Sequence, residues 1–263
     1  MQKAVSSKVS GNARRLKFDH AEITLDGNPG IGALDVSIDD GIPGISGTLA
    51  FDSIDLRSFL AAFTPFASLE NVGAKAASQS GFIRHTNVDL RLSAVKATAG
   101  SVALANVAAT AQGKPGLAVF DVSDASAFGG GLQAGVRIDH KPEGNHVELR
   151  FHATDVDGAQ IAKAFGLTAL FPQATGSASL MLKGIGRDWE TVMDTGEGQI
   201  SATFGAGKVP GIDFAGFLKR AKGAGFFPLS AVSKGTLAID SLDLKATMSD
   251  GVAALDKAEV KSS

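Results

Sequence analysis

The stretch Val147-Glu148-Leu149-Arg150-Phe151-His152 decides the fold class, because its apolar and polar side chains alternate strictly. A period of two places successive side chains on opposite faces of a β-strand, so this stretch predicts a strand with one apolar face. The same alternation recurs in residues 88–93, 178–182, 200–204 and 237–240. Turn-forming residues separate the runs, as in Pro142-Glu143-Gly144-Asn145 and Asp250-Gly251. We therefore predict a mainly β fold, a long antiparallel meander of about 12 to 16 short strands.

Helical patterns are few and short. Residues 55–63 begin with a capping Asp and place Leu56, Phe59, Leu60 and Phe63 on one helical face. Related segments occupy residues 157–165 and 213–220, and each follows an aliphatic residue that ends a predicted strand. This recurring strand–Asp–helix unit has no fixed period, which argues against a solenoid of equal repeats. A fourth short helix is predicted for residues 188–193.

Composition excludes several classes of protein. The 263 residues include 32 glycines without a Gly-X-Y period, which excludes collagen, and 44% hydrophobic residues, which argues against disorder. Cysteine is absent, so disulfides and thiolate chemistry are excluded. The net charge of −2 provides no basic field for nucleic acid, and we predict no nucleic-acid partner. Neither a membrane-spanning run nor a secretory signal is visible in the sequence.

The motifs of common active sites are incomplete. Gly44-Ile45-Ser46-Gly47 lacks the spacing of a nucleophile elbow. Gly205-Ala206-Gly207-Lys208 resembles part of a phosphate loop, but Ala202 and Val209 stand where that motif needs Gly and Ser or Thr. We expect a hairpin turn at this second motif. The sequence thus predicts a protein that is not an enzyme and that has no catalytic residues and no cofactor.

His146, Glu148 and His152 share one face of their predicted strand, and imidazole and carboxylate groups are zinc ligands. Neighbours at i and i+2 lie roughly 7 Å apart, so these three residues need a ligand from another strand to hold a metal. We favour the alternative, in which this is the solvated face of an amphipathic strand, and predict no metal site.

Residues 214–229 combine aromatic and basic side chains. Phe214, Phe217 and Leu218 share a helical face, and Lys219, Arg220 and Lys222 follow near its end. Such a stretch is compatible with an anionic membrane surface. We favour the alternative, in which the phenylalanines pack on the sheet and the cations complement the carboxyl end of the helix.

The run ATGSASLMLKGIGRDWETVMDTGEGQISATFGAGKVPGIDF, residues 174–214, resembles the C-terminal region of the AsmA family. The shared pattern is a Gly-led strand ending in Gly184-x-Gly186, a short helix at Trp189, a second strand led by Gly198, and then residues 207–213. Residues 218–237 and the upstream segments 47–56 and 88–92 continue the likeness. In all, the resemblance covers about 220 residues, and the order of the motifs carries it.

This resemblance implies a bacterial cell-envelope protein at the periplasmic face of the inner membrane, involved in outer-membrane assembly and phospholipid transport. The family's N-terminal membrane anchor is absent here and the last strand pair looks incomplete, which suggests a fragment whose membrane association depends on that missing anchor or on envelope partners. We accordingly expect a flexible N-terminal segment (1–14), a first β unit with a short helix (15–70), a linker or loop (71–86) and an AsmA-like C-terminal β region (87–263), truncated at its end.

The resemblance also implies a curved, groove-like sheet with an apolar interior and a phospholipid or another acyl lipid as partner. About 12 strands at roughly 4.8 Å spacing would extend such a groove by about 55 Å. The residues predicted to contact lipid share strand parity: Leu90, Leu92, Leu149, Phe151, Leu180, Leu182, Ile200 and Phe204. The residues alone favour an ordinary sandwich, in which this face is covered and dry. The alternative function is a structural, adhesin-like surface protein with such a closed core.

Overall fold

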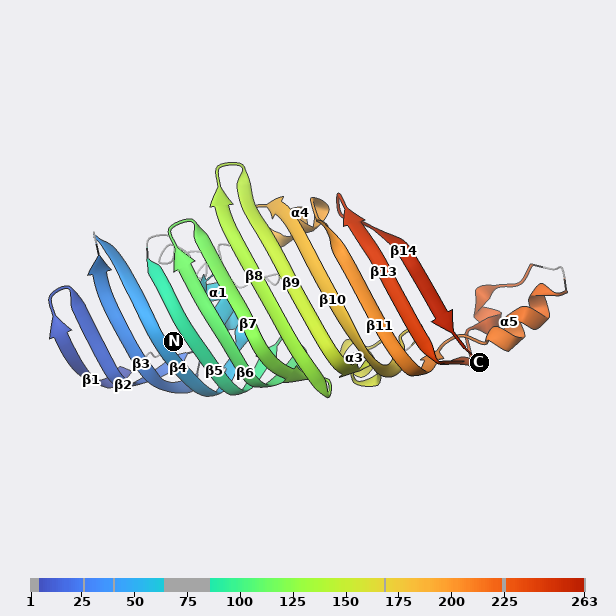
Figure 1. Cartoon of the computed structure of the whole chain (residues 1–263), viewed down its shortest axis with the longest axis horizontal. Helices are drawn as coiled ribbons and strands as arrows, with labels where there is room; N and C mark the ends of the chain where they lie inside the picture. Colours follow the sequence, from blue (N-terminus) through green and yellow to red (C-terminus); the bar gives the residue numbers. More distant parts are fainter. Residues whose placement is uncertain are drawn as a thin grey trace.

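One long, open β-sheet dominates the protein (Figure 1). The computed structural model describes residues 5–25, 27–39, 41–63, 86–167, 169–223 and 226–262. Thirteen of the strands in these residues follow one another from β1 to β11 and then β13 and β14, while β12 pairs with β11. Since β1 and β14 stand at opposite edges, the sheet does not close on itself. The predicted mainly β fold, a long sheet with a few short helices, is confirmed.

The strands are mostly longer than the short strands predicted, and several have 14 residues. Their bounds are β1 Val5–Asn12, β2 Arg15–Leu25, β3 Asn28–Asp39, β4 Ile42–Asp55, β5 Asn87–Ala99, β6 Val102–Lys114, β7 Leu117–Ala127, β8 Gly130–Lys141, β9 Gly144–Asp157, β10 Gln173–Gly186, β11 Glu197–Pro210, β12 Thr236–Ile239, β13 Ser241–Ser249 and β14 Val252–Lys261. The motif Gly205-Ala206-Gly207-Lys208 lies inside β11, so the hairpin turn predicted there is wrong.

The sheet is mixed, because β4 and β5 run parallel, whereas the sequence predicted an antiparallel meander throughout. Parallel neighbours need a crossover that carries the chain back to the starting end, commonly through a helix. Here the crossover comprises residues 56–86 and begins with helix α1, Leu56–Phe63. The pairing of β4 with β5 also joins the two β units expected at 15–70 and 87–263 into one sheet. Nearly all of the expected linker, 71–86, lies outside the described residues.

The predicted helices are confirmed at all four positions. They are α1 Leu56–Phe63, α3 Gly158–Phe165, α4 Trp189–Asp194 and α5 Phe214–Ala221, with a 3-10 turn η1 at Leu229–Val232. In α3 the Asp157 carboxylate accepts a hydrogen bond from the Ala159 amide at 2.8 Å. In α5 the Asp213 carboxylate accepts one from the Gly216 amide at 2.8 Å. A side-chain acceptor at this position satisfies an amide that has no partner inside the helix, which is why the strand–Asp–helix unit recurs.

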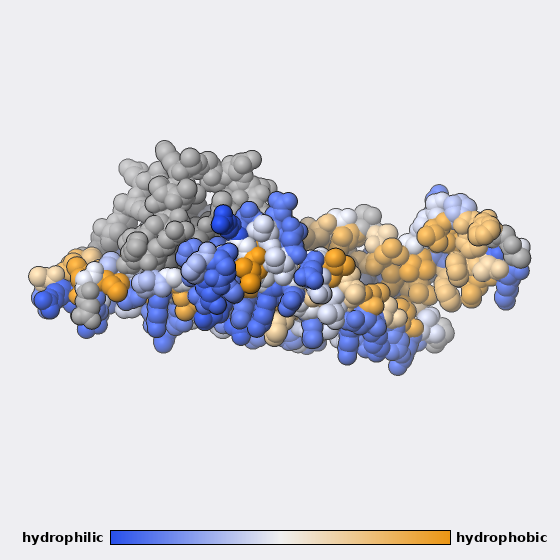
Figure 2. Space-filling model, turned by 90° about the horizontal axis from the view of Figure 1, so that it is seen from above, coloured by the Kyte–Doolittle hydropathy of each residue, from blue (hydrophilic) through white to orange (hydrophobic). Residues whose placement is uncertain are grey.

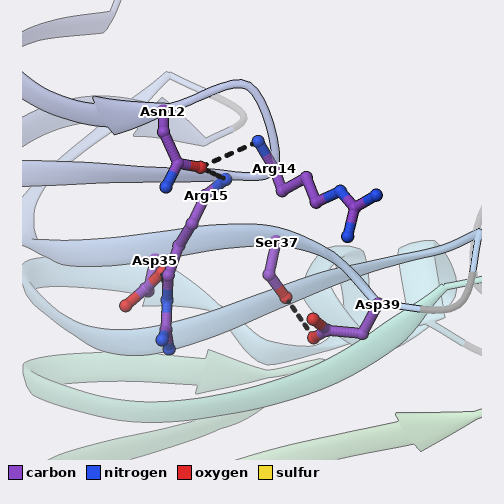
Figure 3. Close-up of polar contacts among 6 residues, drawn as sticks. All are labelled: Asn12, Arg14, Arg15, Asp35, Ser37 and Asp39. Carbon is purple, nitrogen blue, oxygen red and sulfur yellow. Dashed lines mark hydrogen bonds and ion pairs between the residues drawn. The ribbon is translucent and has the colours of Figure 1, made fainter.

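The N-terminal edge of the sheet is ordered by side-chain contacts (Figure 3). The Asn12 side-chain oxygen accepts hydrogen bonds from the amides of Arg14 and Arg15 at 2.9 and 3.0 Å, which fixes the turn between β1 and β2. The Arg15 guanidinium then donates to Asp35 on β3 at 2.9 Å. Residues 5–12 therefore form a paired strand, where a flexible segment was expected over 1–14.

The pairing register shifts at several places in the described strands, and three of these shifts contain a residue with a left-handed backbone. His20, Asn106 and Asp155 have left-handed backbone conformations, with φ of 54°, 53° and 55°, and each lies where the pairing register shifts. A bulge bends its strand and increases the local twist. His, Asn and Asp are the side chains that most readily tolerate this conformation, so the residue types suit the bends in the sheet.

Candidate functional site

The strand register brings the predicted lipid-contacting residues onto one face of the sheet. Directly opposed residues of neighbouring strands share a face. One line of opposed residues, the Leu149 row, crosses all thirteen strands: Val9, Phe18, Leu34, Gly47, Leu90, Ala111, Phe120, Val136, Leu149, Leu182, Gly198, Met248 and Ala253. A second, the Leu180 row, comprises Leu92, Ala109, Val122, Ala134, Phe151, Leu180, Ile200, Ala246 and Leu255. Both rows consist of apolar residues.

The N-terminal part of this apolar face is covered by α1. The Phe59 ring of α1 lies 5.7 Å from the Phe120 ring of β7, centroid to centroid, and Phe59 is 1% exposed. Leu90 and Leu92 belong to the same buried cluster. These two residues, predicted to contact lipid, are therefore part of a closed core in the described structure.

Two short helices cover the face farther along, near opposite ends of the strands (Figure 1). Val192 of α4 is fully buried against Ile138 and Val147 of the sheet. At the other end, the Phe165 ring of α3 lies 6.4 Å from the Phe128 ring. These helices cap the ends of the strands and leave the middle of the face between them less covered.

Glycines allow α4 to approach the sheet. A Cβ atom on Gly184 would lie 2.2 Å from the Val192 carbonyl oxygen, and one on Gly186 would lie 2.5 Å from the Thr191 hydroxyl. The chain after α4 also comes close, because a Cβ on Gly196 would meet the side chains of Leu182 and Met248. The Gly-x-Gly pattern singled out in the sequence therefore serves as the seat of α4.

We expect Gly184→Val to destabilise the fold by about 1–3 kcal/mol, the usual cost of overpacking a filled site. The helix would have to move away from β10, because the added methyl groups meet backbone atoms. Urea denaturation measures this loss. The matched control is Gly131→Val in β8, where a Cβ meets no atom within 4 Å. Equal stability of the two variants would contradict the close seating of α4.

An apolar strip remains between α3 and α4, over β9 to β14. It comprises Leu149, Phe151, Leu180, Ile200, Leu244, Ala246 and Leu255. Leu149, Phe151 and Leu180 are half-buried, Ile200 is 38% exposed and Leu255 is 65% exposed. Figure 2 shows apolar residues gathered over this C-terminal part on one side and hydrophilic residues on the other. Phe151, Leu149 and Leu244 also pack against the buried clusters at the margins of the strip. The strip is therefore a partly covered apolar surface, and its most exposed members are Ile200 and Leu255.

The remaining predicted contacts, Leu182 and Phe204, lie on the same face but are buried. Leu182 lies beneath Gly196, and the Phe204 ring packs edge-on against Phe171 at 6.1 Å. Conversely, the sequence analysis did not identify Leu244, Ala246 and Leu255 as part of the strip. The alternation Leu242-Asp243-Leu244-Lys245-Ala246 was the available signal for two of them.

On the described strands β9 to β14, the charged side chains alternate with the strip and lie on the opposite, polar face. There the Lys183 ammonium pairs with Glu148 across β10 and β9 at 3.2 Å. On β13 and β14, the hydrogen bond from the Lys257 ammonium lowers the pKa of Asp243, and the same bond raises the pKa of Lys257. The seven residues of the strip carry no titratable group, so its chemistry is that of a neutral hydrocarbon surface.

The histidine constellation also lies on the polar face. The His146 imidazole Nε2 contacts the Glu143 carboxylate at 3.0 Å. The Glu148 carboxylate pairs with the Lys183 ammonium. His146 and Glu148 therefore each bind another residue and do not converge on a shared site. Within the part of the chain that the structure describes, no group of three or more His, Asp or Glu residues is placed to hold a metal ion.

A hollow of about 810 Å³ also lies on the polar face. Its lining includes the polar and charged residues Asp121, Arg150, His152, Lys245 and Asp256, and it also includes four residues of the strip, Phe151, Leu180, Ile200 and Ala246, which alternate with polar residues along the strands. The charged side chains in this mixed lining disfavour an acyl chain, since placing hydrocarbon there would strip water from the charges. The apolar strip, although it is not an enclosed cavity, is therefore the better candidate for a hydrophobic ligand.

None of the helices in the described residues has both the length and the apolar character needed to cross a bilayer. Comparisons of the chain with protein-family models, with curated proteins and with solved structures find no match. The AsmA resemblance therefore stays a prediction, which rests on the order of the motifs in residues 174–214 and their neighbours.

Proposed function

We propose that this chain is a non-enzymatic cell-envelope protein of the AsmA type that handles phospholipid by holding acyl chains on the apolar strip. The strip is the single observation that carries the proposal. It is an unbroken apolar surface across five neighbouring strands, without charge and only partly covered. The resemblance supplies the setting, the periplasmic face of the inner membrane, and the process, outer-membrane assembly.

The dimensions of the strip suit an acyl chain. Four spacings separate β9, β10, β11, β13 and β14, which amounts to about 19 Å at roughly 4.8 Å each. One leaflet of a bilayer holds its acyl chains within about 15 Å, half of a hydrocarbon core of about 30 Å. An acyl chain lying across the strands could therefore keep most of its length against apolar side chains, and it needs no hydrogen bond from them.

Extraction of the purified full chain tests the proposal. We expect phospholipid in the organic extract and, by native mass spectrometry, a protein species heavier by the mass of one or more phospholipids. The chain must be expressed in bacteria and purified without detergent, so that any lipid comes from the cell. An extract free of phospholipid, together with a single unliganded mass, would overturn the proposal and favour a structural surface protein.

A further inference from the structure

The chain makes a short excursion from the sheet between β11 and β12. It comprises α5, the following turn and η1, residues 214–232, and it projects beyond the C-terminal edge of the sheet (Figure 1). Its base is held by two backbone hydrogen bonds, from the Gly211 amide to the Gly235 carbonyl at 2.9 Å and from the Asp213 amide to the Val232 carbonyl at 2.7 Å. The buried Val232 adds to this base. The excursion is thus attached firmly at one end.

Away from its base, the excursion exposes its large apolar side chains. No described residue of α5 is buried, so the expectation that its phenylalanines pack on the sheet is wrong. Phe214 and Phe217 stack on each other at 6.4 Å, and Phe217 meets the Phe227 ring at 5.8 Å. Phe226 is fully exposed and Leu229 is 76% exposed. The rings of Phe214, Phe217 and Phe227 thus contact one another, and together with the exposed Phe226 and Leu229 they form an apolar tip (Figure 2).

Cations accompany this apolar tip. Residues 214–239 contain four basic residues and no Asp or Glu, although the whole chain has a net charge of −2. Lys219, Arg220 and Lys222 are exposed near the end of α5. The excursion is therefore a local positive surface beside exposed aromatic rings, on a protein that is otherwise slightly acidic.

We infer that the excursion docks the protein onto the surface of an anionic phospholipid bilayer. The headgroup boundary offers negative charge for Lys219, Arg220 and Lys222 directly beside hydrocarbon for Phe226 and Leu229. Charge complementarity selects this occupant over a neutral surface. A protein partner would instead require a particular acidic site, whereas the fully exposed Phe226 needs only a hydrocarbon layer. This docking does not depend on the apolar strip and is separate from the proposed function.

Vesicle co-sedimentation of the full chain tests the docking. We expect binding to vesicles of phosphatidylcholine with phosphatidylglycerol, weak binding to pure phosphatidylcholine, and a decline as salt rises above about 0.15 M, since salt screens exposed charges. Phe226→Ser with Leu229→Ser should weaken binding by about tenfold or more, a change of about 1.4 kcal/mol. Lys219→Glu with Arg220→Glu should weaken it at least as much, because each cation near an anionic surface contributes on the order of a fivefold factor.

Two matched controls separate docking from general effects. Met181→Ser removes an exposed apolar residue from the sheet, and Lys114→Glu with Lys141→Glu reverses two exposed charges at strand ends. Both should bind vesicles as the parent chain does. Because the changed residues are exposed, far-UV circular dichroism should be unaltered in every variant.

Insertion of the tip has its own readout. Tryptophan emission of Phe226→Trp should shift to shorter wavelength on anionic vesicles, while that of Met181→Trp should not. The inference is overturned if the chain does not bind anionic vesicles or if it binds neutral vesicles equally well. It is also overturned if the variants Phe226→Ser with Leu229→Ser and Lys219→Glu with Arg220→Glu bind anionic vesicles as tightly as the parent chain. Lipid extraction from the same variants distinguishes the two proposals, because loss of docking leaves the apolar strip intact.

Discussion

A Phe59→Ala variant is expected to lose about 3–5 kcal/mol of unfolding free energy, the range for removing a buried aromatic ring. Phe59 is 1% exposed and packs against Phe120, so its ring joins α1 to the sheet. Its loss would leave a cavity between the sheet and α1, the helix that begins the crossover from β4 to its parallel neighbour β5. Urea denaturation monitored by circular dichroism measures the change.

Phe226→Ala is the matched control, since it removes the same ring from a fully exposed position. A surface substitution of this kind should change the free energy of unfolding by less than about 0.5 kcal/mol. If Phe59→Ala were no more destabilising than this control, α1 would not be the cover of the N-terminal core, and the parallel crossover would lose its main support.

The second large effect is expected for Leu180→Arg in the middle of the apolar strip. Leu180 lies between Phe151 and Ile200 in the register. An arginine there places a hydrated charge where an acyl chain would lie, and the charge resists transfer out of water. We expect the phospholipid recovered per protein to fall by about tenfold or more, which requires a loss of only about 1.4 kcal/mol in affinity. Quantitative mass spectrometry of the extracts measures it.

Met181→Arg controls for the added charge on the same strand. Met181 is the next residue, points to the polar face and is 54% exposed, so its arginine remains in water. The lipid content should therefore equal that of the parent chain. Equal losses in both variants would show that lipid retention depends on overall charge, and the strip would not be the binding surface.

Local rules predicted the parts of this fold that depend on neighbours in the sequence. Asp157 and Asp213 each cap a helix at the predicted position, because the acceptor and the amide it satisfies are only two or three residues apart. Strand parity likewise placed all eight predicted contact residues on one face. Alternation fixes the face of a strand without any knowledge of its partners.

Features that depend on distant partners were beyond this reasoning. The parallel pairing of β4 with β5 depends on the end of the sheet at which β5 begins after the crossover. The pattern of neighbouring residues in the sequence contains no information about that position. The alternation of a strand shows which face a side chain lies on, but it does not show whether another element covers that face. Leu90 and Leu180 therefore looked equivalent in the sequence. In the structure, Leu90 is buried in the cluster beneath α1, whereas Leu180 is half-buried. The aromatic stripe of α5 predicted a packed helix, but the excursion lies off the sheet and its rings meet one another instead.

Photo-crosslinking from the strip tests the central claim most directly. A photoreactive amino acid would replace Leu180 in one protein and Met181 in another, and both would be irradiated in the bacterial cell. We predict a covalent adduct with the mass of a phospholipid at position 180 and none at position 181, because only the first lies on the apolar strip. Absence of the adduct at position 180, or equal adducts at both positions, would contradict the account.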